Sequence, residues 1–128
     1  IFELDSPIRL KDQVWLRGKR ASTILEVAKN NTTCIEIVDA GSVKITEMTI
    51  SSAKDAVSLA GISGRNTNNC LIEDVTVTGF AEYGFIFKQR NDNLKVNRCY
   101  FINNFKAHVC FENIAEMNAS WMKQKLFG

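Results

Sequence analysis

Apolar and polar residues alternate along this chain in a pattern that occurs three times. The repeats span residues 43–50, 70–77 and 94–101, and each has apolar residues at its first, third, sixth and eighth places. They begin 27 and 24 residues apart, a period typical of stacked supersecondary units. Within each repeat the alternation breaks for two polar residues and then resumes. Each repeat therefore predicts two short strands with one buried face and a bend between them.

A second series of apolar pairs lies between these repeats and adds a third short strand to each coil. Its members are Ile35 and Ile37, Val57 and Leu59, Phe85 and Phe87, and Val109 and Phe111. Strands this closely spaced leave no room for crossover helices, which excludes a doubly wound α/β fold. We therefore expect an all-β fold, a single-stranded right-handed parallel β-helix with about 24–27 residues per coil. Neighbouring coils then lie about 4.8 Å apart, and equivalent positions stack in columns.

The register of the repeats predicts the core and the organisation of the chain. The inward positions include Ile45, Ile72, Val75, Phe87, Val96 and Phe111. Because each coil of a solenoid contacts only its neighbours and both ends stay open, we expect the chain to be part of a longer β-helix. Its first residue, Ile1, is not a methionine, which fits a fragment or a processed product.

Residues 113–128 differ in pattern from residues 1–112, which hold the expected coils. Ile114, Met117, Trp121 and Met122 fall at helical spacing, and lysines follow them near the end of the chain. This spacing predicts a short helix or an irregular segment that caps the last coil, since solenoid sheets need protected edges. A connector to a following domain, or a contact with a partner chain, is the alternative.

Two segments carry a resemblance to a known superfamily. Residues 6–18 followed by residues 21–25 resemble the opening coils of the pectate-lyase-like superfamily of parallel β-helices. Residues 101–104 followed by residues 107–109 resemble the strand, asparagine-bearing turn and strand of its later coils. Among its members, the chain is most similar to bacteriophage tailspike and appendage proteins and to bacterial polysaccharide-degrading β-helices. The resemblance covers roughly residues 1–112.

This resemblance implies a segment of a trimeric phage tailspike or appendage protein located in the virion. Such a segment would act in host attachment by recognising a cell-surface polysaccharide, with the rest of a longer chain or of the virion as a further partner. A secreted polysaccharide-degrading hydrolase or lyase of the same fold is the first alternative, and an architectural spacer without a ligand is the second. One scaffold can host many unrelated sites, so the fold alone does not decide between them.

Composition and charge narrow the class of protein. The chain is 45% hydrophobic with one proline and a net charge of +2, which excludes disorder. No stretch approaches the roughly 20 apolar residues of a transmembrane helix. The basic residues are spread among nearly as many acids, without a basic stripe or interleaved aromatics, and predict no nucleic-acid partner.

The four cysteines predict free thiols rather than disulfides or a zinc site. Cys70 and Cys99 occupy inward positions of the repeats, while Cys34 and Cys110 lie beside strand cores. No pair has the spacing of a zinc site. Free thiols fit a protein folded in a reducing compartment, which a phage protein made in bacterial cytoplasm would meet. We expect no metal and no cofactor.

One column of the expected solenoid offers an acid pair for catalysis. Alignment of the repeats stacks Glu47, Asp74 and Arg98 at the bend. Glycoside hydrolysis needs two neighbouring carboxylates, and backbones about 4.8 Å apart suit a retaining enzyme better than an inverting one. Acidic residues are also common at bends, and Arg98 could neutralise both carboxylates. We therefore expect any catalytic site to lie in coils outside this segment.

Candidate glycan-binding residues come from a loop and from two aromatic positions. Residues 60–69 are rich in glycine and asparagine and are expected to protrude as a loop. In that loop, Arg65 and Asn66 could hydrogen-bond an acidic sugar. Tyr83 and Trp15 could stack on a pyranose ring. The alternative for each is an ordinary turn residue or a partly packed aromatic.

A last column indicates an oligomer face. Ser58, Ile86 and Cys110 fall at the outward place between buried residues, so that two of three are apolar where water is expected. An outward apolar column predicts cover by another chain. By analogy with tailspikes, we expect a homotrimer with Ile86 and Cys110 in its interface.

Overall fold

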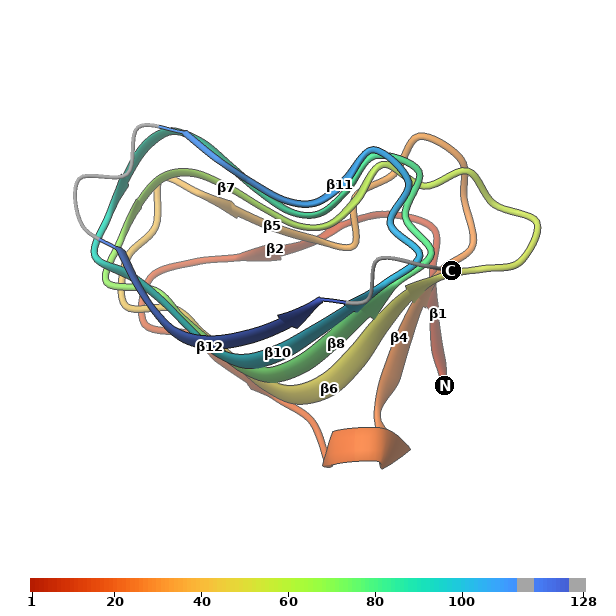
Figure 1. The fold of residues 1–128 in the computed structure, drawn as a ribbon, viewed down its shortest axis with the longest axis horizontal. Coiled ribbons are helices and arrows are strands. Elements are labelled where there is room, and N and C mark those ends of the chain that lie inside the picture. The colour runs from red at the N-terminus through yellow and green to blue at the C-terminus, as the bar shows by residue number, and fades with distance from the viewer. Residues whose placement is uncertain (113–116, 125–128) are drawn as a thin grey trace.

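The computed structural model describes residues 1–112 and 117–124, and it shows one parallel β-helix with two walls (Figure 1). The first sheet contains β1 (Phe2–Leu4), β3 (Trp15–Arg17), β4 (Ile24–Val27), β6 (Lys44–Ser52), β8 (Leu71–Thr78), β10 (Leu94–Ile102) and β12 (Met117–Gln124). The second contains β2 (Ile8–Leu10), β5 (Ile35–Val38), β7 (Ala60–Asn68), β9 (Tyr83–Asp92) and β11 (Ala107–Phe111). The expected all-β solenoid is confirmed.

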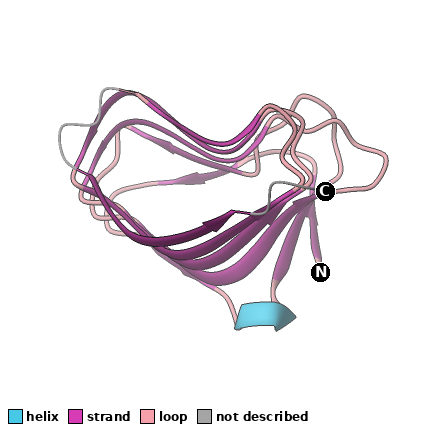
Figure 2. Cartoon of the chain, in the orientation of Figure 1, coloured by secondary structure: helices cyan, strands magenta, loops and turns pink. Residues whose placement is uncertain are grey.

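The chain alternates between the two sheets, and every strand pairs in parallel with the strand one coil away. In the first sheet the order is β1-β4-β6-β8-β10-β12, with β3 also paired to β6. In the second sheet the order is β11-β9-β7-β5-β2. Figure 2 shows the two sheets facing each other, with a short 3₁₀ turn (η1, Arg20–Ser22) below the first sheet.

The long strands of the first sheet bend where the sequence pattern predicts it. Glu47, Asp74 and Arg98 sit at equivalent places in β6, β8 and β10 with φ values of 61°, 55° and 47°. A left-handed residue turns the chain without ending the ladder, so that each apolar repeat is one bent strand. The later coils therefore have two strands where the alternation predicted three shorter ones, whereas β3 and β4 stay separate and pair with the two halves of β6.

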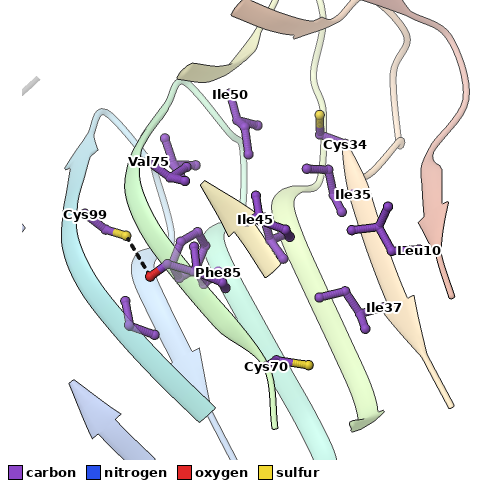
Figure 3. Packing of buried hydrophobic residues seen from close by; sticks show 14 of the residues in the cluster. Leu10, Cys34, Ile35, Ile37, Ile45, Ile50, Cys70, Val75, Phe85 and Cys99 are labelled. Atoms are coloured by element: carbon purple, nitrogen blue, oxygen red, sulfur yellow. Dashed lines mark hydrogen bonds between the residues drawn. The ribbon is translucent and has the colours of Figure 1, made fainter. Parts of the chain in front are cut away.

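The core lies between the two walls and consists of stacked inward columns. Ile45, Ile72, Val75, Phe87 and Val96 are fully buried, and Phe111 packs against the same cluster. Figure 3 shows members of this cluster pointing into the interior from both sheets. The predicted inward register is confirmed at all six positions.

The expected loop over residues 60–69 is wrong, because residues 60–68 form β7. Its partners are β5 and β9, and Gly64 lies opposite Phe87. A Cβ at Gly64 would come within 2.2 Å of the Phe87 ring. This glycine makes room for an aromatic ring of the next coil and does not form a turn. The protruding segment is instead residues 53–59, seen between β6 and β7 in Figure 1.

Because the strand of this coil begins at Ala60, Val57 and Leu59 lie before it and not within a strand as predicted. Val57 lies in the protruding segment with 57% of its surface exposed. Ile62 pairs with Phe85 in its place. The apolar residues Val57 and Leu59 resemble a strand in sequence. The strand of this coil instead contains Gly61 and Gly64, at positions where a larger side chain would clash with the crowded interior.

Of the two forms expected within residues 113–128, a short helix or an irregular segment, the helix is wrong where the structure describes the backbone. Residues 117–124 form β12, which pairs in parallel with β10 and places Met117 opposite Leu94. The register shifts twice along this pair, so that its apolar residues do not alternate regularly. This irregularity explains why the spacing resembles a helix. Ile114 and Lys125 lie outside the described residues, and the role of the segment as a cap stays a prediction.

All four cysteines are free thiols, as predicted, and they differ in burial. Cys34, Cys70 and Cys99 are buried, whereas Cys110 is half-buried. Burial raises the pKa of the Cys34 and Cys99 thiols to about 12. The Cys99 sulfur also lies 3.8 Å from the Ile72 carbonyl oxygen (Figure 3).

We expect thiol labelling of the native protein at pH 8 to modify Cys110 first. The thiolate is the reactive form, and a pKa of about 12 leaves Cys34 and Cys99 protonated and enclosed. Labelling with an aromatic disulfide reagent, followed by peptide mapping, measures the order. All four thiols should react after unfolding in guanidinium. Fast native labelling of Cys34 would contradict the core described above.

Candidate functional site: a groove on the second sheet

A groove of about 720 Å³ lies on the outer face of the second sheet. The strands of this sheet curve toward the core along their middle (Figure 1). The groove crosses four successive coils and is lined by Arg9, Leu10, Lys11, Glu36, Val38, Ser63, Gly64, Arg65, Ile86 and Lys88. These residues come from β2, β5, β7 and β9 and the residue after β2.

Two outward columns supply most of the lining. In the first, Arg9 lies beside Glu36, which is followed by Ser63, Ile86 and Cys110 in successive coils. In the second, Val38 lies beside Arg65, and Arg65 lies beside Lys88. Strand alternation sends these side chains away from the core. The first column thus gives the groove a polar edge that ends in the apolar Ile86, and the second gives it a basic edge that includes the apolar Val38.

The charges in the groove are unevenly compensated. Arg9 Nε donates to Glu36 Oε1 at 3.0 Å, which closes one edge as an ion pair. Lys11, Arg65 and Lys88 make no ion pair with any residue that the structure describes. The sequence spreads its basic residues evenly, and only the stacking of coils brings these three to one face.

The family comparison agrees with this architecture. The sequence matches the family model described as "Right handed beta helix region" over residues 11–121. The chain belongs to this right-handed β-helix family. No curated protein and no solved structure matches the chain. The predicted β-helix superfamily and the predicted hand of the solenoid are therefore confirmed.

Of the predicted glycan-binding residues, the structure places Arg65 in the groove of this right-handed β-helix. Asn66 follows Arg65 at the bend of β7, with φ of 54°, and its Nδ2 donates to Asp39 Oδ1 at 2.7 Å. Asn66 therefore stabilises the edge of the groove without lining it. Lys11, Val38 and Lys88 were missed, because their common feature is a column that appears only when the coil register is known.

The two predicted aromatic residues lie elsewhere. Trp15 belongs to the other sheet, where its indole nitrogen donates to Thr46 Oγ1 at 2.9 Å. Its ring lies 5.0 Å from the guanidinium carbon of Arg17 and 5.4 Å from Lys44 Nζ. Tyr83 begins β9 and has Lys106 Nζ 5.5 Å from its ring. The structure does not bring Trp15, Tyr83 and Arg65 into one site.

The predicted acid pair does lie at one bend column, but arginines hold both carboxylates. Arg98 binds Asp74 with two bonds, from Nε to Oδ1 at 2.8 Å and from Nη2 to Oδ2 at 3.1 Å. The hydrogen bond from Arg98 lowers the pKa of Asp74. Glu47 Oε2 accepts from Arg17 Nε at 2.8 Å.

A general acid needs a raised pKa, whereas this geometry keeps Asp74 ionised. The bend column therefore has the character of a ladder of surface ion pairs. A catalytic role for Glu47 and Asp74 stays a prediction. In the part of the chain that the structure describes, no group of three or more His, Cys, Asp or Glu side chains could hold a metal ion. No helix among the described residues has the length and apolar character that a membrane crossing needs.

The outward column predicted for oligomerisation is partly wrong. Ile86 and Cys110 are adjacent in one outward column, as expected, and both are half-buried, but Ser63 precedes them in the column. Ser58 is fully buried and accepts a hydrogen bond from Ser52 Oγ at 2.9 Å. Ser58 was assigned to this column because a strand was predicted at residues 57–59, whereas the strand of this coil is β7. Ile86 also lines the groove, which connects this column to the candidate site.

Proposed function

We propose that this right-handed β-helix binds a cell-surface polysaccharide in the groove of its second sheet, as a segment of a phage tailspike or appendage protein in host attachment. The observation that carries the proposal is the groove itself, which crosses four coils and combines hydrogen-bonding side chains with the apolar Val38 and Ile86. Carbohydrate chains offer hydroxyl groups at their edges and C–H groups on their ring faces. Such a ligand matches both parts of the lining.

The direction of the groove supports a polymer as the ligand. Its lining side chains come from successive coils along the solenoid axis, about 4.8 Å apart. A chain laid along this axis meets outward side chains of each coil in turn. Val38 on one edge and Ile86 on the other provide apolar contacts, and Ser63 in the coil between them provides a hydroxyl.

The proposal includes a homotrimer in a virion, with its subunit contacts on another face. The cores of protein interfaces are depleted in charged residues. The groove, in contrast, contains Arg9, Lys11, Glu36, Arg65 and Lys88. This charge content favours a ligand-binding face over a subunit interface. Ile86 and Cys110 are accordingly assigned to the groove side of the molecule in this proposal.

Filling the groove tests the proposal. The Ser63→Trp variant places an indole in the middle of the groove and should weaken binding of its polysaccharide by about tenfold or more. Affinity electrophoresis through gels containing purified capsular, O-antigen or teichoic polymers measures the retention. Thr78→Trp adds the same side chain to the outward face of the other sheet and should leave retention unchanged.

Two results would contradict the proposal. One is equal retention of the wild type and the Ser63→Trp variant in a gel that retains the wild type. The other is the absence of retention in every polymer of the panel. Release of reducing or unsaturated ends from a retained polymer would instead identify the protein as a degrading enzyme.

A further inference from the structure

The basic edge of the groove contains like charges in direct register. Arg65 of β7 pairs with Lys88 of β9, so that their backbones lie about 4.8 Å apart. Like charges directly opposite each other on neighbouring strands are destabilising. Lys11 lines the same groove from the first coil. The fold thus gathers three positive charges where repulsion opposes them.

Arg65 differs from every other arginine of the chain. The others form ion pairs with carboxylates: Arg9 with Glu36, Arg17 and Arg20 with Glu47, Arg90 with Asp92, and Arg98 with Glu73 and Asp74. Arg65 has no such pair among the described residues. Of the nearby acids, Glu36 is paired with Arg9, and Asp39 accepts from the neutral amide of Asn66 and forms no ion pair with Arg65.

This arrangement points to a ligand that supplies the missing negative charge. We infer that the groove takes an anionic polysaccharide, laid along the solenoid axis with its acidic groups on Lys11, Arg65 and Lys88. The inference rests on the proposed function and names the charge of the ligand. The Arg65 guanidinium can bind a carboxylate or a phosphate with two parallel hydrogen bonds, and the lysines act as point charges.

The lining discriminates against other anionic polymers. Single-stranded nucleic acids bind on aromatic side chains that stack with the bases. The residues that line the groove include no aromatic ring, and Glu36 places a carboxylate on the edge opposite the cations. A polymer with acidic groups along one edge and sugar faces over Val38 and Ile86 fits the lining better.

The test uses the full chain, in which two basic side chains of the groove are replaced by neutral side chains of similar size. The Arg65→Gln/Lys88→Gln double variant should lose retention by polygalacturonate and by poly(glycerol phosphate) teichoic acid by about tenfold or more. Arg65→Lys should keep part of the retention, because the charge remains while the paired hydrogen bonds are lost. Lys95→Gln removes an exposed lysine of the other sheet and should have no effect. Thermal melts confirm that all variants fold.

The two polymers separate carboxylate from phosphate as the source of the charge. Retention by either one that falls in the double variant and with added salt supports the inference. If the Ser63→Trp variant loses retention of a neutral polysaccharide such as dextran while the double variant keeps it, the inference is overturned and the proposed function stands. Equal retention by polyglutamate would also overturn it, since charge alone would then explain binding. Failure of every polymer would overturn both.

Discussion

The Phe87→Asp variant is expected to lose the folded β-helix. Phe87 is fully buried, with its ring centroid 6.4 Å from Phe85 and 5.9 Å from Phe111. Loss of a buried phenylalanine side chain costs about 3–5 kcal/mol, and an unpaired buried carboxylate adds several more. Domains of this kind have a total free energy of unfolding of about 5–15 kcal/mol. Circular dichroism should show no cooperative melt.

A matched surface variant controls this experiment. Lys95 is exposed on β10, and Lys95→Ala should change the free energy of unfolding by less than about 0.5 kcal/mol. Urea titrations of both variants measure the difference. A Phe87→Asp protein that unfolds at the same urea concentration as Lys95→Ala would mean that Phe87 faces solvent. The inward register of the second sheet would then be wrong.

The core of the first sheet was predictable because local alternation alone decides it. Residues 43–50, 70–77 and 94–101 alternate around a polar pair, and each pair contains the left-handed residue that bends the strand. Burial of one strand face needs no knowledge of neighbouring coils. Ile45, Ile72 and Val96 therefore point inward as expected, in register with one another.

The strand positions of the second sheet were harder to predict, because they depend on side chains from other parts of the coil stack. Gly61 and Gly64 suggest a turn when residues 60–69 are considered alone. In the structure a Cβ at Gly61 would lie 2.6 Å from Val77, and one at Gly64 would lie 2.2 Å from Phe87. The reason for each glycine is a side chain elsewhere in the coil stack. Local turn chemistry could not reveal it.

The candidate site depends on the same register. Arg65 was a predicted binding residue, but its neighbours Val38 and Lys88 are 27 and 23 residues away in sequence and meet it only through strand pairing. Trp15 and Arg65 were predicted for one ligand and belong to different sheets. A column of charge becomes visible only once the length of every coil is known. Coil lengths vary where segments such as residues 53–59 protrude.

Asn104→Leu is the second variant expected to have a large effect. Asn104 is 6% exposed and lies in the turn between β10 and β11. Its Oδ1 accepts from the Phe80 backbone nitrogen at 3.1 Å, and its Nδ2 donates to the Val77 carbonyl oxygen at 3.1 Å. Leucine has a similar size and leaves both backbone groups buried without partners. Each unsatisfied group costs about 1–3 kcal/mol, so that the loss should total about 2–6 kcal/mol.

The neighbouring asparagine provides the control, because it has the same chemistry without the burial. Asn103 is exposed with φ of 55°, a conformation that glycine adopts freely. Asn103→Gly should therefore melt close to the wild type, while Asn104→Leu should melt roughly 10 °C lower. Differential scanning calorimetry measures both. Equal melting temperatures would mean that the buried Asn104 amide does not stabilise the contact between the β10–β11 turn and the preceding coil. A large loss in Asn104→Leu alone would attribute the stability of the corner to two hydrogen bonds that join successive coils.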